Sequence, residues 1–400
     1  MGQRRPPRGS HGRIVIAGAL TQRSEYGGHV WAFLQYVLGY RRLGWDVFFV
    51  DQLSADMCVD ENGRRCAPHR SPKVQRFARV MEDFELEDRA ALLVDGQTVV
   101  GVEKPRLVQR TRDATFLLNV MGYLDDHDIL AAASHRVFLD IDPGFGQMWR
   151  ALGLADVFAG HDKFVTVGEN IQRPGCDIPD CGLEWITTVP PVVLDLWPPC
   201  TGGRDVFTTI GAWRGPYGPV EYRGRSYGLR VHEFRQLAEL PRRVDVGLEA
   251  ALDIGAADER DRDTLLSGGW SLVDPQEGAG DPATYRDYIQ GSMGELMVAK
   301  NMYVQTQGGW FSDRSACYLA SGKPVVAQDT GWTHNHSAGE GLLSFNTPEE
   351  AASALREVCR NYRRHANAAR ELADTVFASD IVLERLASQV CETESAGAIT

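Results

Sequence analysis

The chain has 400 residues, of which 43% are hydrophobic and 24% are charged, and its formal net charge is -12. This length is too great for one ordinary hydrophobic core and predicts two domains of about 150 to 200 residues each. The negative charge argues against a nucleic-acid-binding surface, which is normally basic. No apolar run approaches the roughly 18 residues that an integral membrane segment needs.

Residues 1–12 are basic and lack the apolar segment of a secretory signal, so we expect a disordered arm on a cytoplasmic protein. The eight cysteines are scattered, and the closest pair, Cys176 and Cys181, lacks the spacing of a metal site. Free thiols are therefore expected. Arginine outnumbers lysine and alanine is abundant, which is compatible with a bacterial genome rich in GC.

The first half opens with a predicted βαβ unit. An apolar run over residues 13–20 predicts a strand, an amphipathic stretch from Val30 to Gly44 predicts a helix, and residues 45–51 predict a second strand. The glycine pair Gly27 and Gly28 comes before the helix, where missing side chains let backbone amides approach a ligand. A lone glycine pair is weak evidence, and His29 after it is either a functional base or an ordinary helix residue.

Residues 58–96 are polar and charged, with one predicted surface helix in KVQRFARVMEDF. Apolar runs then recur at 116–120, 137–141, 164–167 and 185–189, and this alternation with helical sequence predicts a mostly parallel sheet. Asp140 and Asp142 stand at one strand end, and His161 and Asp162 precede the next strand. Asp142 is either a turn residue before Pro143 or a functional carboxylate.

Prolines from Pro190 to Pro199, followed by CTGGRD, indicate a linker. We place the first domain at residues 13–192, the linker at 193–205, the second domain at 206–377, and a final helix and tail at 378–400. The second domain begins with a strand that ends in a glycine turn, Ile210 to Gly215. A helix at 229–237, strands at 244–248 and 270–273, and a helix at 282–289 are expected next.

The stretch from Gly294 to Trp332 predicts a second βαβ unit: a strand over 302–305, a glycine turn, a helix over 313–320, and a strand over 324–327. The loop before this helix would lie at the carboxyl end of the sheet, where open α/β folds bind ligands. Ser312, Asp313, Arg314 and Ser315 place hydroxyls, free amides and a guanidinium there, which suits a diphosphate. They equally suit plain helix capping, and Lys300 faces either this ligand or solvent.

The chain ends with a loop, a short strand, and helices over 349–377 and 381–390, the first opening with a proline at its start. His334 and His336 in that loop do not specify a zinc site, so no metal is expected.

The run GGWFSDRSACYLASGKPVVAQDTG resembles the C-terminal-domain signature of GT-B fold glycosyltransferases, most closely the family-4-like branch. The order of strand, GG loop, helix and LGWDV strand near the N-terminus is also similar to that branch. The resemblance implies an α/β GT-B architecture, with two Rossmann-like βαβ domains facing across a cleft and a final helix that crosses back to the first domain. One departure is that the acidic residue usual inside the 313–320 helix falls on Cys317.

The resemblance implies a nucleotide-sugar-dependent hexosyltransferase that moves a sugar to a small-molecule natural product or a glycan acceptor. A UDP- or dTDP-sugar is the favoured donor, and no metal or other cofactor is required. An inverting enzyme would need a base, for which His29 or Asp142 is placed suitably, whereas a retaining enzyme needs none. The expected donor contacts are Gly27, Gly28, Gly211, Trp213, Arg214, Lys300, Ser312, Asp313, Arg314 and Ser315.

Two other readings stay open. A GT-B fold nucleotide-sugar epimerase or phosphorylase would share the architecture, and Cys317 is compatible with a non-catalytic partner protein that has lost its donor contacts. Selective affinity for one nucleotide separates an enzyme from such a partner. The sequence is also compatible with a homodimer.

Overall fold

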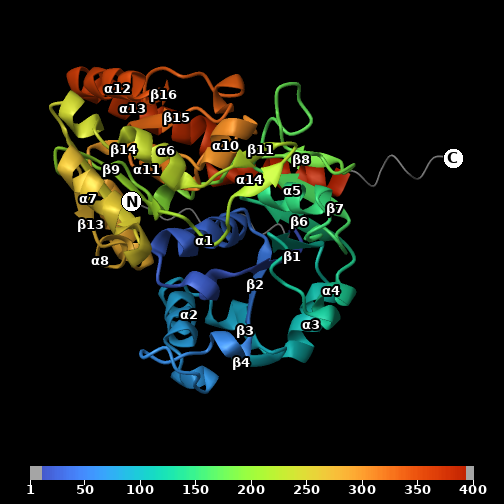
Figure 1. Ribbon diagram of the computed structural model, residues 1–400. Coiled ribbons are helices and arrows are strands. Elements are labelled where there is room, and N and C mark those ends of the chain that lie inside the picture. Colours follow the sequence, from blue (N-terminus) through green and yellow to red (C-terminus); the bar gives the residue numbers. More distant parts are fainter. Residues whose placement is uncertain (1–10, 393–400) are drawn as a thin grey trace, which may run out of the picture.

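The computed structural model describes residues 11–392 and contains two main β-sheets, each packed against helices (Figure 1). The larger sheet has eight strands in the order β4-β3-β2-β1-β5-β6-β7-β8, and the smaller has six in the order β13-β12-β9-β14-β15-β16. This arrangement confirms the predicted pair of Rossmann-like domains. Residues 1–10 of the expected arm and 393–400 of the expected tail lie outside the described residues.

The first sheet is parallel except for the β3–β4 pair. Its buried strands are short apolar runs that contain many β-branched residues. Such runs form strands because helices cover both faces of the sheet. The elements of this half are β1 (Arg13–Gly18), α1 (Gly27–Arg42), β2 (Asp46–Leu53), α2 (Pro72–Asp83), β3 (Ala90–Val94), β4 (Gln97–Gly101), α3 (Lys104–Arg112), β5 (Phe116–Val120), α4 (His127–Ala132), β6 (Arg136–Asp140), α5 (Phe145–Ala151), β7 (Lys163–Thr166) and β8 (Trp185–Thr187).

The β3–β4 hairpin was missed in the sequence, where residues 58–96 were expected to be polar with a single helix. The run AALLV of β3 is fully apolar and buried. Asp95 and Gly96 follow it with positive φ angles of 46° and 76°, the backbone that a tight Asp-Gly hairpin turn requires.

The second half carries the smaller sheet and a separate two-stranded hairpin. Its elements are β9 (Val206–Ala212), β10 (Val220–Tyr222), β11 (Arg225–Tyr227), α6 (Arg230–Phe234), β12 (Gly247–Asp253), α7 (Glu259–Gly268), β13 (Ser271–Val273), α8 (Pro275–Ala279), α9 (Pro282–Gln290), β14 (Gly294–Met297), α10 (Asn301–Thr306), α11 (Asp313–Ala320), β15 (Val325–Gln328), β16 (Leu342–Phe345), α12 (Pro348–Arg360), α13 (Tyr362–Leu372), a π-helix (Ala373–Phe377) and α14 (Ser379–Glu392).

The prediction of the second βαβ unit was right for its second part and wrong for its first. Helix α11 and strand β15 lie where expected, and Gly322 has the positive φ of 68° expected after a helix. Residues 302–305 form part of helix α10, whereas the strand is β14. A short apolar run does not by itself distinguish a strand from a buried helix turn, and this one lies after the true strand. The strand expected at 244–248 begins three residues later, as β12.

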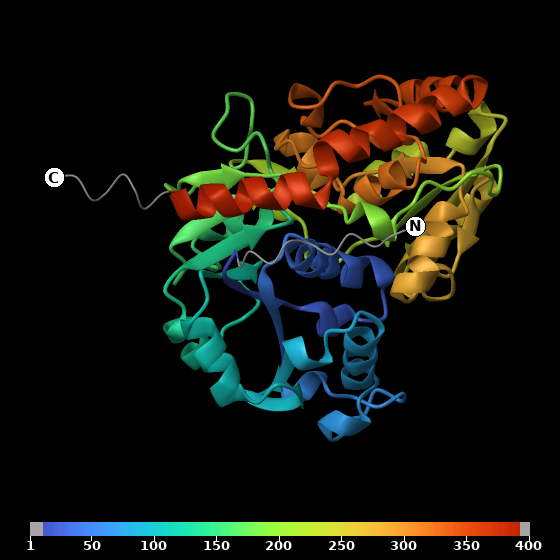
Figure 2. The ribbon, with the colours of Figure 1, turned by 180° about the vertical axis from the view of Figure 1, so that it is seen from behind.

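The two halves are connected by residues 193–205 and also pack against each other. Trp197 in this segment is fully buried and packs edge-on against Trp31 of α1, with ring centroids 5.0 Å apart. Helix α14 returns to the first half and lies along α1 (Figure 2), where Gly39 leaves room for Leu383. No helix within residues 11–392 is long and apolar enough to cross a membrane.

Candidate active site

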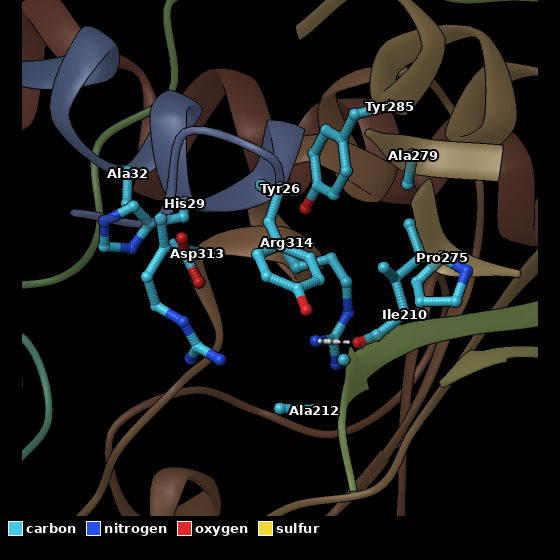
Figure 3. A pocket seen from close by; sticks show the side chains of 13 residues that line it. Tyr26, His29, Ala32, Ile210, Ala212, Pro275, Ala279, Tyr285, Asp313 and Arg314 are labelled. Atoms are coloured by element: carbon cyan, nitrogen blue, oxygen red, sulfur yellow. Dashed lines mark hydrogen bonds between the residues drawn. The ribbon is translucent and has the colours of Figure 1, made fainter. Parts of the chain in front are cut away.

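Three adjoining cavities lie at the carboxyl ends of the parallel strands. The inner cavity, about 250 Å³, is shown in Figure 3 and is lined by Arg23, Tyr26, Gly28, His29, Ala32, Ile210, Gly211, Ala212, Pro275, Ala279, Tyr285, Asp313 and Arg314. Its neighbour, which we call the aromatic cavity, has a volume of about 240 Å³ and shares Arg23, His29, Ala212, Asp313 and Arg314 with it. The outer cavity, about 330 Å³, meets the inner one at Tyr26 and Pro275.

Two buried guanidinium groups meet at the wall of the inner and aromatic cavities. Arg314, in the first turn of α11, donates from Nη1 to the carbonyl of Ile210 at 2.7 Å and from Nε to Glu295 at 2.5 Å. Arg230, the first residue of α6, donates from Nη1 to the same carbonyl at 3.2 Å. Each arginine is 8% exposed. Within residues 11–392, Glu295 is the only carboxylate that forms an ion pair with either.

Arg230 is buried beside a second guanidinium group and forms no ion pair of its own within residues 11–392. Burial, together with the charge of Arg314, lowers the pKa of Arg230 to about 9. The Nε of Arg230 and the Nη2 of Arg314 are buried and have no partner among the described residues. Buried donors normally have a partner, so these atoms mark a place where an anion would be stabilised.

The N-terminus of α11 points at the same place. The hydroxyl of its N-cap residue, Ser312, accepts no backbone hydrogen bond, and the residue is 1% exposed and lines the aromatic cavity. Asp313 lines both cavities, and burial raises the pKa of its carboxyl group. The helix dipole favours a bound anion here, as the sequence predicts.

His29 lies on the opposite wall, in the first turn of α1 (Figure 3). Its Nε2 lies 2.7 Å from the carbonyl of Ala19, and its ring packs edge-on against Phe33. Burial lowers the pKa of His29 to about 4, so the imidazole is neutral at physiological pH. Because Nε2 must then donate to the Ala19 carbonyl, Nδ1 keeps its lone pair.

Asp142 and Lys300 come from opposite halves and form an ion pair in the aromatic cavity. The Nζ of Lys300 lies 2.7 Å from both carboxylate oxygens of Asp142 and 3.1 Å from the hydroxyl of Tyr303. Burial lowers the pKa of Lys300. The sequence named both residues for the site, but both carboxylate oxygens of Asp142 are occupied by Lys300, whereas Nδ1 of His29 has no partner within residues 11–392, which favours His29 as the base.

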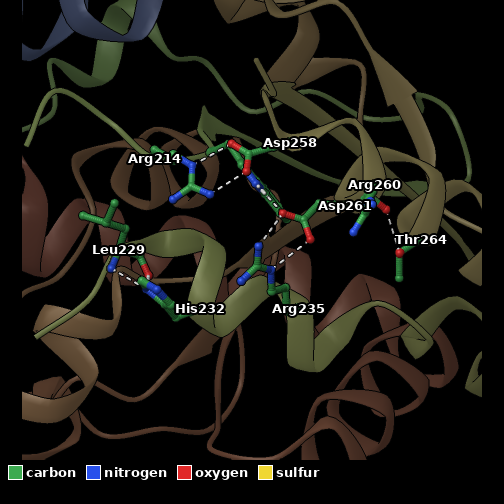
Figure 4. Close-up of polar contacts among 9 residues, drawn as sticks. Arg214, Leu229, His232, Arg235, Asp258, Arg260, Asp261 and Thr264 are labelled. Atoms are coloured by element: carbon green, nitrogen blue, oxygen red, sulfur yellow. Dashed lines mark hydrogen bonds and ion pairs between the residues drawn. The ribbon is translucent and has the colours of Figure 1, made fainter. Parts of the chain in front are cut away.

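Arg214 and Trp213 differ from the sequence expectation in where their side chains point. The guanidinium of Arg214 makes two hydrogen bonds to Asp258, at 2.6 Å and 2.5 Å, as Figure 4 shows, although the residue borders the aromatic cavity. Trp213 is 1% exposed, packs in the core of the second half against Phe234, and lines none of the three cavities. Its indole nitrogen donates to Asp261, so the ring faces the core of the second half and not the cavities.

The three site glycines allow close packing, and two of them, Gly28 and Gly211, also line the inner cavity. A side chain at Gly27 would lie 2.1 Å from the carbonyl oxygen of Asp281, and one at Gly28 would meet the ring of Tyr285 at 2.8 Å. Both glycines are the opening residues of α1 rather than a loop before it, and they let α9 approach. A side chain at Gly211 would come within 1.6 Å of Nη1 of Arg230, so this glycine makes room for the guanidinium.

Three further residues named in the sequence analysis lie away from the cavities. Ser315 is fully buried, and its hydroxyl has no partner among the described residues. Cys317 is 3% exposed and receives a hydrogen bond from Gln35. Asp140 accepts hydrogen bonds from Gln147 and Thr166, so it has a structural role. No group of side chains within residues 11–392 could hold a metal ion.

Sequence reasoning missed Arg23, Tyr26 and Arg230, and also the aromatic lining. Arg230 follows the short Gly228-Leu229 turn and opens a helix, a local signal comparable to that of Arg314. The aromatic residues have no such signal, because they come together only in the fold: Phe33, Tyr123, Tyr217, Tyr303 and Trp310.

Comparison with solved structures finds the same architecture over nearly the whole chain. Sucrose-phosphate synthase from Thermosynechococcus elongatus matches with a TM-score of 0.57 and 11% identity, covering 97% of this chain and 100% of that one. HepE from Anabaena in complex with UDP-glucose gives 0.58 and 12%, covering 96% and 100%. AviGT4, a glycosyltransferase involved in avilamycin A biosynthesis, gives 0.55 and 13%, covering 95% and 97%. The chain has the GT-B fold.

Sequence similarity does not assign the chain to a protein family. Neither protein-family models nor curated protein sequences match this chain. At 11% to 13% identity, the solved structures establish the fold, and the chemistry of the site has to be argued from its own residues.

Proposed function

We propose that the protein is a glycosyltransferase that moves a sugar from a nucleotide diphosphate sugar to a small-molecule or glycan acceptor. The observation that carries the proposal is the convergence of Arg230 and Arg314 on one carbonyl, with two buried donor atoms unpartnered. A diphosphate leaving group would supply the missing negative charge. In a transferase this charge grows as the sugar leaves, so fixed guanidinium groups stabilise the transition state without a metal.

The aromatic cavity is the proposed place of sugar and acceptor. It adjoins the arginines, and its tyrosine and tryptophan rings suit the apolar faces of sugars or an aromatic acceptor. His29, neutral and with Nδ1 unshared, is the proposed base of an inverting reaction. The Lys300–Asp142 pair then orders the cavity floor, and Lys300 is a second cation near the leaving group.

HepE is described in complex with UDP and with UDP-glucose, which supports a UDP-sugar as the first donor to test. Binding is measured calorimetrically with UDP, dTDP, GDP, ADP and CMP, for the wild type and for Arg230→Gln. The proposal expects one nucleotide to bind selectively and the substitution to weaken it at least tenfold. Incubation with the matching nucleotide sugar should then release the nucleotide, and release should be slower in His29→Gln.

A non-catalytic GT-B-like protein is the alternative that one observation favours, because Cys317 replaces the acidic residue usual in the resembling branch. That alternative predicts that none of the five nucleotides binds, or that a nucleotide binds and no nucleotide sugar is ever cleaved.

A further inference from the structure

An acidic residue, Asp253, ends strand β12 at the junction of the inner and outer cavities. The outer cavity is formed by the ends of β12 and β13 and by the start of α8, and it includes Asp253. Tyr26 and Pro275 line both cavities. A ligand long enough to fill both must therefore pass these two residues, with Asp253 beside it.

Tyr26 holds one oxygen of this carboxylate and leaves the other unoccupied. Its hydroxyl donates to Oδ2 of Asp253 at 2.8 Å, across the two halves of the chain. This is the only hydrogen bond that the Asp253 carboxylate accepts within residues 11–392, so Oδ1 has no partner there. A half-buried carboxylate oriented in this way can accept a hydrogen bond from a ligand hydroxyl.

The first sheet offers a direct contrast, because Asp51 of β2 pairs with Gly18, the last residue of β1, just as Asp253 pairs with the last residue of β9. Asp51 is fully buried, and its oxygens are occupied by the amide and hydroxyl of Thr21, each at 2.7 Å, and by the amide of Gln52. Its role is to hold a turn of the chain. The two acids share a topological position, but Asp253 alone faces a cavity with an oxygen free.

The strand register places Asp253 beside the strand end that lines the inner cavity. Asp253 pairs with Ala212 on the neighbouring strand β9, and Ala212 lines the inner cavity together with Arg314. Neighbouring strands lie about 4.8 Å apart. In Rossmann-type sites the pyrophosphate binds after the first strand, and an acid at the end of the second strand bonds the ribose hydroxyls. Strands β9 and β12 are the first and second strands of this sheet along the chain.

We infer that Asp253 binds the ribose 2′,3′-hydroxyl edge of the donor nucleotide and that Tyr26 positions its carboxylate for this contact. The inference rests on the proposed function, because it takes the diphosphate to lie at Arg230 and Arg314. The base then enters the outer cavity. Helix α11 offers no alternative acid at this junction, since Cys317 is turned to Gln35 and Asp313 does not line the outer cavity.

The test compares ribose with its dideoxy form. Calorimetry measures the Kd of UDP, GDP and ADP and of their 2′,3′-dideoxy forms, for the wild type, Asp253→Ala and Tyr26→Phe. A hydrogen bond to a charged group is worth about 1.5 to 3 kcal/mol, so the wild type should prefer the ribose form by about ten- to a hundredfold. Asp253→Ala should bring this ratio close to one while leaving the Kd of the dideoxy form nearly unchanged. Tyr26→Phe should keep a preference, because the carboxylate remains.

Asp245→Ala is the matched control, since this exposed acid lies just before the opposite end of β12 and should leave every Kd unchanged. The inference is overturned if the wild type binds both forms equally, or if Asp253→Ala keeps the preference; nucleotide binding itself would still support the proposed function. If no nucleotide binds at all, both the proposed function and the proposed ribose contact are refuted.

Discussion

Replacing Arg230 with methionine should raise stability and lower affinity together. Arg230 is 8% exposed, burial lowers its pKa to about 9, and no carboxylate pairs with it among the described residues. Within residues 11–392 the only hydrogen bond of its side chain goes to the Ile210 carbonyl, which keeps Arg314 as a donor in the variant. A methionine side chain is similar in length to the aliphatic part of arginine and would occupy the same space beside Gly211. Replacement of a poorly compensated buried charge by an apolar side chain typically stabilises by about 1 to 4 kcal/mol, and we expect a gain at the lower end.

The opposite effect is expected on the nucleotide. Loss of one charge-assisted contact to a diphosphate costs about 1.5 to 3 kcal/mol, or roughly ten- to a hundredfold in Kd. Urea unfolding of the free protein and calorimetry with UDP measure the two quantities on the same samples. Arg235→Met is the control, since Arg235 directly follows α6, pairs with Asp261 of α7 (Figure 4) and lines none of the three cavities. If Arg230→Met destabilises the free protein and leaves Kd unchanged, Arg230 is a structural residue and our reasoning about the cleft is wrong.

Two further predictions concern the walls of the cleft. Gly211→Ala should displace the Arg230 guanidinium and raise the Kd of UDP about tenfold. Gly218→Ala is the control, because no atom lies within 4 Å of the added carbon and binding should not change. Equal Kd values for the two variants would contradict this prediction. Lys300→Met should leave Asp142 without its cation and lower the free energy of unfolding by about 1.5 to 3 kcal/mol, and adding Asp142→Asn should restore part of the loss, which urea unfolding of the single and double variants measures.

Local sequence signals were sufficient to predict an element where they determine its structure without contacts from elsewhere in the chain. Ser312, Gly322 and Pro324 mark the two ends of α11, and the structure has that helix where they predict it. The run at 302–305 failed because its apolar character reflects burial, and burial is shared by strands and helices. The hairpin at Asp95 and Gly96 had a readable turn signal that the charged surroundings obscured.

The site itself was predictable only in part, because side-chain direction depends on partners far along the chain. Arg214 was chosen as the basic residue after β9, yet it turns to Asp258, 44 residues away. Arg230 instead points into the cleft because Gly211 leaves it room. His29 and Asp313 come from the two halves of the chain and line the same cavity. A local sequence pattern cannot show that residues so far apart in the chain lie close together.

The pH dependence of stability gives a test of His29 that does not depend on the substrate. Its pKa in the folded protein is about 4, against 6.5 for an unburied histidine, so its contribution to stability is present above pH 6.5 and is lost as the pH falls toward 4. Between pH 7 and pH 5 the loss amounts to about 2 kcal/mol. Asp51 acts in the opposite direction, since burial raises its pKa to about 7 and its contribution is lost as the pH rises through that value.

These opposing contributions make the total pH profile uninformative, but the difference between two proteins isolates one group. Urea unfolding at pH 7 and pH 5 should show that His29→Gln removes about 2 kcal/mol of pH dependence, whereas His69→Gln, at an exposed position, removes none. Equal slopes for wild type and His29→Gln would mean that the pKa of His29 is the same in the folded and the unfolded protein. Burial would then not hold the imidazole in its neutral form, and the assignment of Nδ1 as the proton acceptor would lose its support.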